Sequence, residues 1–285
     1  MHDDVSPLAG TEVHYLQSAH VGDEFKVFVG RCGPADATAL PVLYLTDANG
    51  HFGAAVDAIR TMQLSQFLPP MLVVGIGYRR GGLADTEDLR TRDYTPSRDE
   101  VFVRVYSERA GLGGAPQFLR FIGDELMPWV ADRYPVDPGD ATYFGHSLGG
   151  LFGTYALLSA PETFARYIIA SPSYWWDKGV TFRLEAEYAA SHRDLPANVF
   201  FGIGDAEDVD GRNRECVNLS EQERAITAEF PIDMVATMHK FVDRLGGRGY
   251  PGLIVSEQVF ADEFHITVAP LILSHGLRRL FNAPH

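Results

Sequence analysis

Two patterns of apolar and polar positions alternate along the chain. Short runs rich in Val, Ile, Tyr and Phe are separated by longer stretches in which apolar residues recur every three or four positions. The runs predict β-strands and the longer stretches predict amphipathic helices. Several runs are apolar on both faces, as in parallel strands that lie between layers of helices. Strands are expected at residues 24–32, 41–47, 71–78, 141–147, 166–172, 198–205 and 252–260.

The clearest helical patterns lie at residues 118–134 and 234–245. In each, large apolar side chains form one stripe, which is expected to face the core. The stripes consist of Phe118, Phe121, Ile122, Leu126, Trp129 and Val130 in the first stretch and of Met234, Met238, Phe241 and Leu245 in the second. The two patterns together predict an α/β fold, in which helices cover both faces of a mostly parallel central sheet.

Two polar segments interrupt this pattern after strand ends. Residues 79–116 are rich in Gly, Arg, Asp and Thr and include the stretch GLGGAP, which is unsuited to a fixed helix or strand. We expect a mobile cap or flap there that covers the active-site mouth, with apolar residues Val101, Phe102, Val103, Val105 and Tyr106. The second polar segment is residues 204–225. In an open parallel sheet, loops at the carboxyl ends of strands build the site.

Composition narrows the class of protein. With 285 residues, of which 46% are hydrophobic, the chain is expected to fold as one domain over residues 1–285. The net charge of -14 disfavours nucleic acid and anionic membranes as partners, because both need a basic face. Cys32 and Cys216 are too few for a disulfide framework, and the acidic N-terminus does not resemble a signal peptide. A cytoplasmic protein without a membrane span is therefore expected.

The stretch YFGHSLGGLFG places Ser147 between a predicted strand and a predicted helix. This is the arrangement of a nucleophile elbow, in which the serine hydroxyl is exposed at a helix N-terminus. Side chains two residues before or after the serine would collide with neighbouring backbone, so Gly145 and Gly149 suit the turn. The alternative is a serine that only caps a helix. We interpret Ser147 as a nucleophile.

A serine nucleophile needs a base, and in this arrangement the base comes last along the chain. Downstream of Ser147, the residues His192, His239 and His275 fall in helical patterns. His265 lies instead in the short polar loop ADEFHIT, after the last predicted strand. An imidazole in that loop can reach over the sheet edge to the serine, so His265 is the expected base.

The acid that orients the base is less well defined. Four carboxylates crowd the end of the strand at residues 198–205: Asp205, Glu207, Asp208 and Asp210. Glu207 stands three residues beyond Gly204, a spacing that lets its carboxylate fold back over the strand end. We expect Glu207 to hold the base in the correct tautomer, with Asp205 as the next candidate.

The oxyanion that forms during acyl transfer needs two backbone N–H donors. One is expected from Leu148, directly after the nucleophile, and the other from the loop DANGHF, where Asn49 is favoured over Ala48. Motifs for other chemistries are incomplete. GIGY and GIGD lack the third glycine of a dinucleotide site, and His51 and His146 lack partners at metal-binding spacing. No cofactor and no metal are expected.

These residues lie in stretches that resemble the putative-esterase family of α/β-hydrolases, and within it the siderophore trilactone esterases. The resemblance spans nearly the whole chain and is carried by PVLYLTDANGHF, RTRDYTP, the block around GHSLGG and ASPSYWW, and EFHITVAP. It implies an α/β-hydrolase fold with a loop excursion over the active site, and an acyl-enzyme mechanism. By position it also implies Ser147 as nucleophile, His265 as base and residues 47–49 as the upstream oxyanion donor. Some siderophore esterases resemble Ser-His dyads, which leaves the acid open.

Several residues are candidates for binding the substrate beside the nucleophile. Tyr174 and Trp175 follow the predicted strand that ends in ASP, and they are candidates for an aromatic wall that binds substrate, the alternative being a place in the core. Arg92, with Arg90 beside it, is a candidate for binding an anionic substrate group. The alternative is ion pairing with nearby carboxylates, Asp88 and Asp93.

The resemblance implies the chemistry more closely than the substrate. The same family includes acyltransferases, S-formylglutathione hydrolases and feruloyl esterases, so each is an alternative to a siderophore esterase. A non-catalytic binding protein on a hydrolase scaffold is the alternative of another class. Such proteins typically lack the serine or the histidine, and both are present here. A small-molecule ester is therefore the expected partner, and a serine esterase the expected enzyme.

Overall fold

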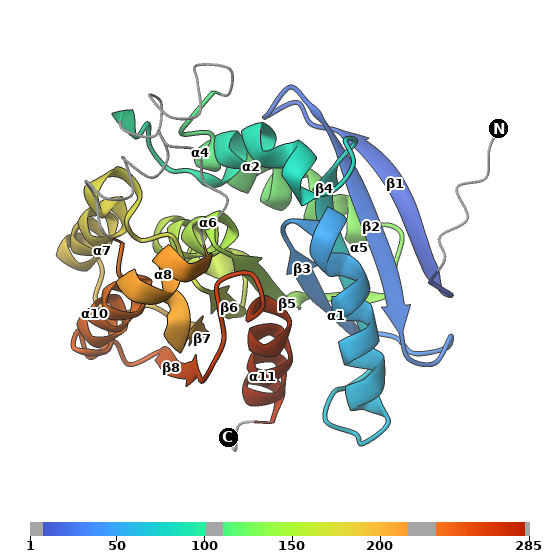
Figure 1. Ribbon diagram of the computed structural model, residues 1–285. Coiled ribbons are helices and arrows are strands. Elements are labelled where there is room, and N and C mark those ends of the chain that lie inside the picture. Colours follow the sequence, from blue (N-terminus) through green and yellow to red (C-terminus); the bar gives the residue numbers. More distant parts are fainter. Residues whose placement is uncertain (1–7, 101–110, 216–231, 283–285) are drawn as a thin grey trace.

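The computed structural model describes residues 8–100, 111–215 and 232–282 (Figure 1). At its centre is an eight-stranded sheet in the order β1-β2-β4-β3-β5-β6-β7-β8. From β4 to β8 all neighbours are parallel, whereas β1 and β2 join this block as antiparallel strands. The strands are β1 (Thr11–Gln17), β2 (Glu24–Cys32), β3 (Leu40–Leu45), β4 (Met71–Tyr78), β5 (Val136–His146), β6 (Arg166–Ala170), β7 (Ala197–Gly204) and β8 (Leu253–Phe260).

The mostly parallel sheet is confirmed, and every predicted strand is present. β2 and β4 have the predicted bounds, whereas β5 begins earlier, at Val136. The sequence pattern missed β1, which lies at the edge of the sheet beside β2. Its side chains alternate between exposed and half-buried positions, so it lacks the continuous apolar run that marks the buried strands.

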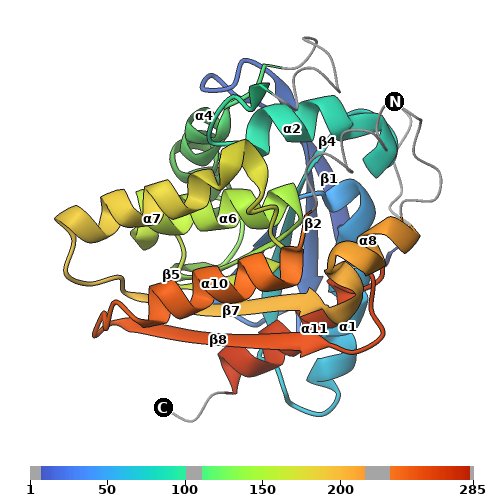
Figure 2. The same ribbon diagram turned by 60° about the vertical axis from the view of Figure 1, so that its left-hand side comes forward.

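Helices cover both faces of the sheet, as predicted (Figures 1 and 2). α1 (Ala48–Gln63) and α11 (Ala269–Phe281) contact each other and pack against one face. α6 and α10 pack against the other face, where α2, α4 and α7 contribute to the same side of the core. The bounds of these and the remaining helices are α2 (Glu87–Tyr94), α4 (Ala115–Arg120), α5 (Met127–Ala131), α6 (Leu148–Ser159), α7 (Val180–Ser191), α8 (Val209–Glu215) and α10 (Met234–Gly246).

The two-sided cover explains why the strands are apolar throughout. In β3, Leu43 and Leu45 join the core under α1 and α11, whereas Val42 and Tyr44 join the core on the opposite face. Successive side chains of a strand point to opposite faces, so a strand between two helical layers buries every position. All six residues of β3 are buried.

The helix predicted at residues 118–134 is present but is not uniform. α4 passes into a π-helical turn at Phe121–Leu126 and then into α5. The wider turn directly precedes Pro128, which has no N–H to donate to the preceding turn of an α-helix. Of the predicted stripe, Trp129 is only partly buried. The other members are almost fully buried: Phe118, Phe121, Ile122, Leu126 and Val130.

The segment 79–116 contains more regular structure than expected. It includes a 3-10 turn (Leu83–Thr86) and α2, which contacts α4 and α6. The sequence pattern did not predict α2, because the mostly polar sequence of this helix lacks an apolar stripe. The expected apolar flap residues, Val101 to Val103, Val105 and Tyr106, lie outside the described residues. The segment 204–225 begins with a 3-10 turn (Asp205–Glu207) and α8.

Candidate active site

Ser147 lies between β5 and α6, at the carboxyl end of a central strand. Its backbone has φ 61° and ψ -118°, a strained conformation for a residue with a side chain. A Cβ atom on Gly145 would lie 2.3 Å from the Gly149 carbonyl oxygen, and one on Gly149 would lie 2.6 Å from Thr46 Oγ1. The turn therefore needs glycine at both positions, as the sequence pattern predicted.

His265 reaches this serine from the loop after β8. Its Nε2 atom lies 3.0 Å from Ser147 Oγ, within hydrogen-bond distance. Its Nδ1 atom lies 2.6 Å from Glu207 Oε2. The ring is 8% exposed, so little water competes for these contacts. A neutral imidazole that donates from Nδ1 to the carboxylate has Nε2 free to accept the serine proton.

Glu207 lies in the 3-10 turn after β7 and is fully buried. Its Oε1 accepts hydrogen bonds from the Ser171 hydroxyl at 2.6 Å and from the Gly204 N–H at 2.8 Å. These donors stabilise the buried carboxylate and leave Oε2 directed at His265. Asp205 is exposed, and Asp208 accepts a hydrogen bond from the Gly211 N–H. Of the candidate acids, the structure brings Glu207 to His265.

Two further histidines lie beside His265, and the sequence pattern did not suggest them. The rings of His146 and His265 are 4.5 Å apart, and the His51 ring is 5.9 Å from that of His146. Burial is the main cause that lowers the pKa of His51 and holds that of His146 well below its ordinary value. Both rings are therefore neutral near pH 7, so they add no positive charge that would oppose protonation of His265.

The other downstream histidines lie elsewhere in the fold. His192 ends α7 and stacks on Tyr188. His239, on α10, pairs with Glu257 of the edge strand β8 at 3.0 Å. Both histidines therefore have partners outside the candidate active site.

The backbone of residues 46–49, which we call the oxyanion loop, lies against the first turn of α6. Thr46 Oγ1 is 3.3 Å from the Tyr143 hydroxyl, which donates to the Gly149 carbonyl at 2.7 Å. Ala48 and Asn49 are the first residues of α1, and Leu148 is the first residue of α6. Two helix N-termini thus meet next to Ser147, and their first N–H groups have no partner within their own helices.

The side chain of Asn49 has a role that sequence reasoning missed. Its Nδ2 donates to the carbonyl oxygens of Tyr78, Arg80 and Gly81 at 2.8 to 3.0 Å, and its Oδ1 accepts the Tyr78 N–H at 2.8 Å. The amide thus holds the turn that follows β4. Only the backbone N–H of Asn49 is left to act as an oxyanion donor.

The candidate substrate-binding aromatics have different surroundings. Tyr174 is 1% exposed, contacts Phe241 in the core and has its hydroxyl 2.7 Å from Thr154 Oγ1. It cannot line an open wall in this position, so the core alternative applies to it. Trp175 is only partly buried and stays a candidate. Ser173, two residues earlier, has its Oγ 3.4 Å from Ser147 Oγ and is a neighbour that the sequence did not reveal.

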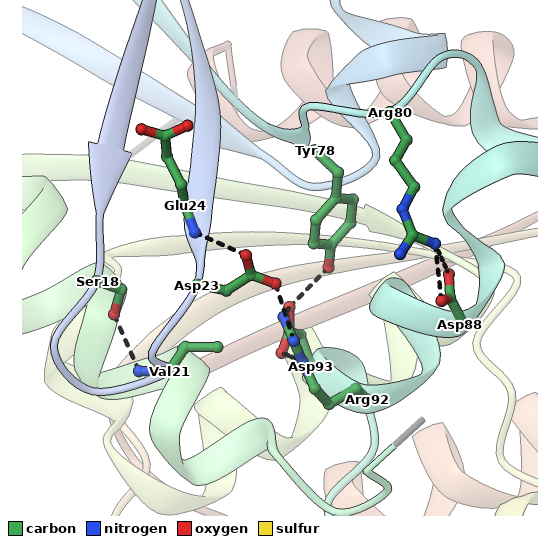
Figure 3. Close-up of polar contacts among 9 residues, drawn as sticks. All are labelled: Ser18, Val21, Asp23, Glu24, Tyr78, Arg80, Asp88, Arg92 and Asp93. Carbon is green, nitrogen blue, oxygen red and sulfur yellow. Dashed lines mark hydrogen bonds and ion pairs between the residues drawn. The ribbon is translucent and has the colours of Figure 1, made fainter. Parts of the chain in front are cut away.

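Arg92 is engaged by two carboxylates (Figure 3). It forms two hydrogen bonds with Asp93, at 2.7 and 2.9 Å, and a third with Asp23 at 3.0 Å. Asp93 also accepts the Tyr78 hydroxyl, at 3.0 Å. The ion-pair alternative therefore describes Arg92 better than recognition of an anionic substrate. Asp88, the other carboxylate considered as an ion-pair partner for these arginines, is bound by Arg80 instead.

The described ranges contain no group of three or more His, Cys, Asp or Glu side chains arranged to hold a metal ion. In the same ranges, no helix combines the length and the apolar composition of a membrane span.

Comparisons with known proteins identify the family of this chain. A family model described as "Putative esterase" matches residues 18–248. Ferri-bacillibactin esterase BesA of Bacillus subtilis is 29% identical over 95% of this chain and 89% of its own length. Siderophore triacetylfusarinine C esterase of Aspergillus fumigatus is 36% identical over 60% of this chain and 58% of its own length.

The crystal structure of the BES protein from Bacillus cereus has a TM-score of 0.76 and 26% identity, over 98% of this chain and 97% of that one. The expected α/β-hydrolase fold is confirmed by this likeness. The family match extends over most of the chain and includes Ser147 and Glu207. The chain therefore belongs to the putative-esterase family, and it is a carboxylic ester hydrolase.

Proposed function

We propose that this chain is a siderophore esterase that hydrolyses its substrate through an acyl-enzyme on Ser147. The observation that carries the proposal is the contact series from Ser147 through His265 to the buried Glu207, with distances of 3.0 and 2.6 Å. This is the relation of nucleophile, base and orienting acid that acyl transfer requires.

In the first half of the reaction, Ser147 Oγ attacks the ester carbonyl while His265 Nε2 takes its proton. Glu207 stabilises the imidazolium that forms. The tetrahedral intermediate collapses, and His265 returns the proton to the leaving alkoxide. In the second half, water takes the place of serine as the nucleophile and releases the acid from the enzyme.

The oxyanion of both tetrahedral intermediates is proposed to accept hydrogen bonds from the N–H groups of Leu148 and Asn49. Both belong to first turns of helices, where the helix dipole adds to the stabilisation of negative charge. Because the pKa values of His51 and His146 are lowered, these two rings add no positive charge that would oppose protonation of His265.

The substrate class rests on the relatives. BesA and the triacetylfusarinine C esterase are named for esters of siderophores, and the first of them aligns with almost the whole chain. Trp175, partly buried and two residues beyond Ser173, is proposed to contact the aryl or acyl part of the substrate. A cytoplasmic site of action stays a prediction, which fractionation of cells that express the chain would test.

The test compares purified protein on a catecholate trilactone, with and without bound iron, and on p-nitrophenyl acetate. We expect hydrolysis of the trilactone at a kcat/KM well above that of the acetate. Hydrolysis of p-nitrophenyl esters alone would reject the siderophore substrate and leave the esterase mechanism standing. Added alcohols test the acyltransferase alternative, since a transferase would make new esters faster than free acid.

A further inference from the structure

A buried ion pair joins α2 to the oxyanion loop. Asp47 is 2% exposed, and the side chain of Arg90 is 12% exposed. Arg90 Nε donates to Asp47 Oδ1 at 3.0 Å, and Arg90 Nη2 donates to Asp47 Oδ2 at 2.9 Å. Burial is the largest single influence and would raise the pKa of the Asp47 carboxyl, but the charge and hydrogen bonds of Arg90, with smaller contributions from His51 and His146, lower the pKa overall. The carboxylate is therefore charged and held in one geometry.

Asp47 has an unusual conformation for its place in the fold. It precedes the first residue of α1, where an aspartate side chain commonly accepts a hydrogen bond from the first helical turn. Here the side chain makes no such bond, and the backbone is left-handed, with φ 55° and ψ 36°. Such a backbone costs on the order of 1 kcal/mol for a residue other than glycine, so surrounding contacts must hold it. Arg90 supplies the contacts to the side chain.

Tyr94, one turn after Arg90 on α2, holds the backbone of the same residue. The Asp47 N–H donates to the Tyr94 hydroxyl at 3.2 Å. The Tyr94 ring is fully buried and packs against Phe118 and Phe152. Because Phe152 belongs to α6, α2 contacts both the oxyanion loop and the helix that begins at Leu148.

The first N–H groups of α1 follow directly from this conformation. The Asp47 carbonyl accepts the N–H groups of Gly50 and His51, at 3.0 and 3.1 Å. Ala48 and Asn49 come before these donors, so their N–H groups are the ones left for a ligand. A change in the backbone of Asp47 would move both groups relative to Ser147.

We propose that Arg90 is a positioning residue for ester hydrolysis, acting through Asp47 to set the oxyanion loop opposite Ser147. This inference rests on the proposed function, since it takes the Leu148 and Asn49 N–H groups as the oxyanion donors. Arg90 itself touches neither the substrate nor the reacting atoms. It acts on the tetrahedral intermediate because the loop it holds carries one of the two donors.

The test is Arg90→Lys, which keeps the charge but cannot form two parallel hydrogen bonds with a carboxylate. We expect kcat for p-nitrophenyl acetate to fall by about 10- to 100-fold, as expected for a donor displaced by about 1 Å. KM should change by less than about threefold, because the donor acts on the transition state more than on the bound ester. Affinity for phenylboronic acid, which forms a tetrahedral adduct with a serine, should fall in parallel with kcat.

The matched control is Arg248→Lys. Arg248 also forms two hydrogen bonds with a buried carboxylate, that of Glu185, at 2.6 and 3.0 Å. Glu185 lies on α7, and its second partner is Arg244 of α10. The same substitution at this pair is expected to lower stability without changing kcat.

A second variant separates positioning from folding. Arg90→Ala should lose at least as much activity as Arg90→Lys, and millimolar guanidinium should restore part of kcat by occupying the vacated space beside Asp47. Guanidinium does not repair a misfolded chain, because it favours unfolding.

The outcomes are distinct. If the wild-type protein hydrolyses the ester and Arg90→Lys keeps its kcat within about twofold while only its melting temperature falls, Arg90 has a structural role and the inference is wrong. An inactive wild-type protein would instead reject the proposed function, and with it this inference.

Discussion

The two sides of Ser147 are held by different means. On the proton-transfer side, the proposed reacting groups are side chains that contact one another directly, from Ser147 to His265 to Glu207. On the oxyanion side, the proposed donors are backbone N–H groups, and the ion pair of Asp47 and Arg90 fixes the loop that carries one of them. A reacting side chain can be found from its residue type and place in a motif. Any residue type can supply a backbone N–H donor, so the contacts that position such a donor can be identified only in the folded structure.

The largest effect is expected from removing the nucleophile, because without Ser147 Oγ neither the tetrahedral intermediate nor the acyl-enzyme can form. Ser147→Ala should lower kcat/KM for p-nitrophenyl acetate by about 10⁴-fold or more, while the far-ultraviolet circular dichroism stays unchanged. Ser274→Ala on α11, whose hydroxyl bonds the Pro270 carbonyl, is the control and should keep full activity. If Ser147→Ala lowers kcat/KM by only a few fold, Ser147 is not the nucleophile, and the comparison of its two sides no longer applies.

Loss of the base tests whether the proton-transfer side acts as a unit. His265→Ala should lower kcat nearly as much as Ser147→Ala, and the double variant should be no slower than either single variant. The control is His239→Ala, which removes another histidine paired with a carboxylate, that of Glu257 on β8. A double variant much slower than both single variants would mean that the two residues are not partners.

The next largest effect on kcat is expected from changing the proposed acid, Glu207. Glu207→Gln should lower kcat by about 10²- to 10⁴-fold, because an amide can hold the wrong tautomer of His265 and carries no charge. Asp205→Asn and Asp208→Asn are the controls, since neither side chain is the one directed at His265. A loss of less than about tenfold in Glu207→Gln would favour a Ser-His dyad.

The smallest effect concerns stability and pH at the buried histidines. Burial, with the charge of His265 as a second cause, holds the pKa of His146 well below its ordinary value. Below about pH 6.5 the unfolded chain therefore binds a proton that the folded chain does not. Stability from this group is complete at neutral pH and is lost as the pH falls, by up to about 1.4 kcal/mol per pH unit.

Urea unfolding at pH 7.5 and pH 5.5 measures this dependence. His146→Gln should show a smaller loss of unfolding free energy between the two pH values than the wild-type protein. Equal pH dependence in both proteins would mean that His146 is protonated as readily in the folded state as in the unfolded chain.

The sequence was sufficient to predict a mostly parallel sheet covered by helices and to propose site residues that have a distinctive local pattern. The buried strands are continuous apolar runs, and Ser147 is flanked by glycines that the turn requires. His265 stands out because it follows the last strand in a polar loop. Glu207 could be favoured only by its spacing from Gly204, and in the fold this spacing lets the Gly204 N–H donate to its carboxylate.

The remaining features depend on contacts between distant parts of the chain. Arg90 and Asp47 are 43 residues apart, and nothing local distinguishes their pair from the alternative pairs with Asp88 or Asp93. Tyr174 and Trp175 are neighbours in sequence, yet one lies in the core and the other is only partly buried, since the direction of each side chain depends on the packing of α10. α2 escaped prediction because its charged residues make ion pairs and its stability comes from few buried positions.

The most direct test of the acyl-enzyme mechanism is labelling by a fluorophosphonate, followed by intact-mass and peptide analysis. An activated serine forms a covalent bond to phosphorus with loss of fluoride, and the adduct mimics the tetrahedral intermediate. We expect one adduct per chain, on the peptide that contains Ser147, and a greatly slowed reaction in His265→Ala. Absence of labelling in the wild-type protein, or an adduct on another residue, would contradict the assignment of Ser147 as the nucleophile.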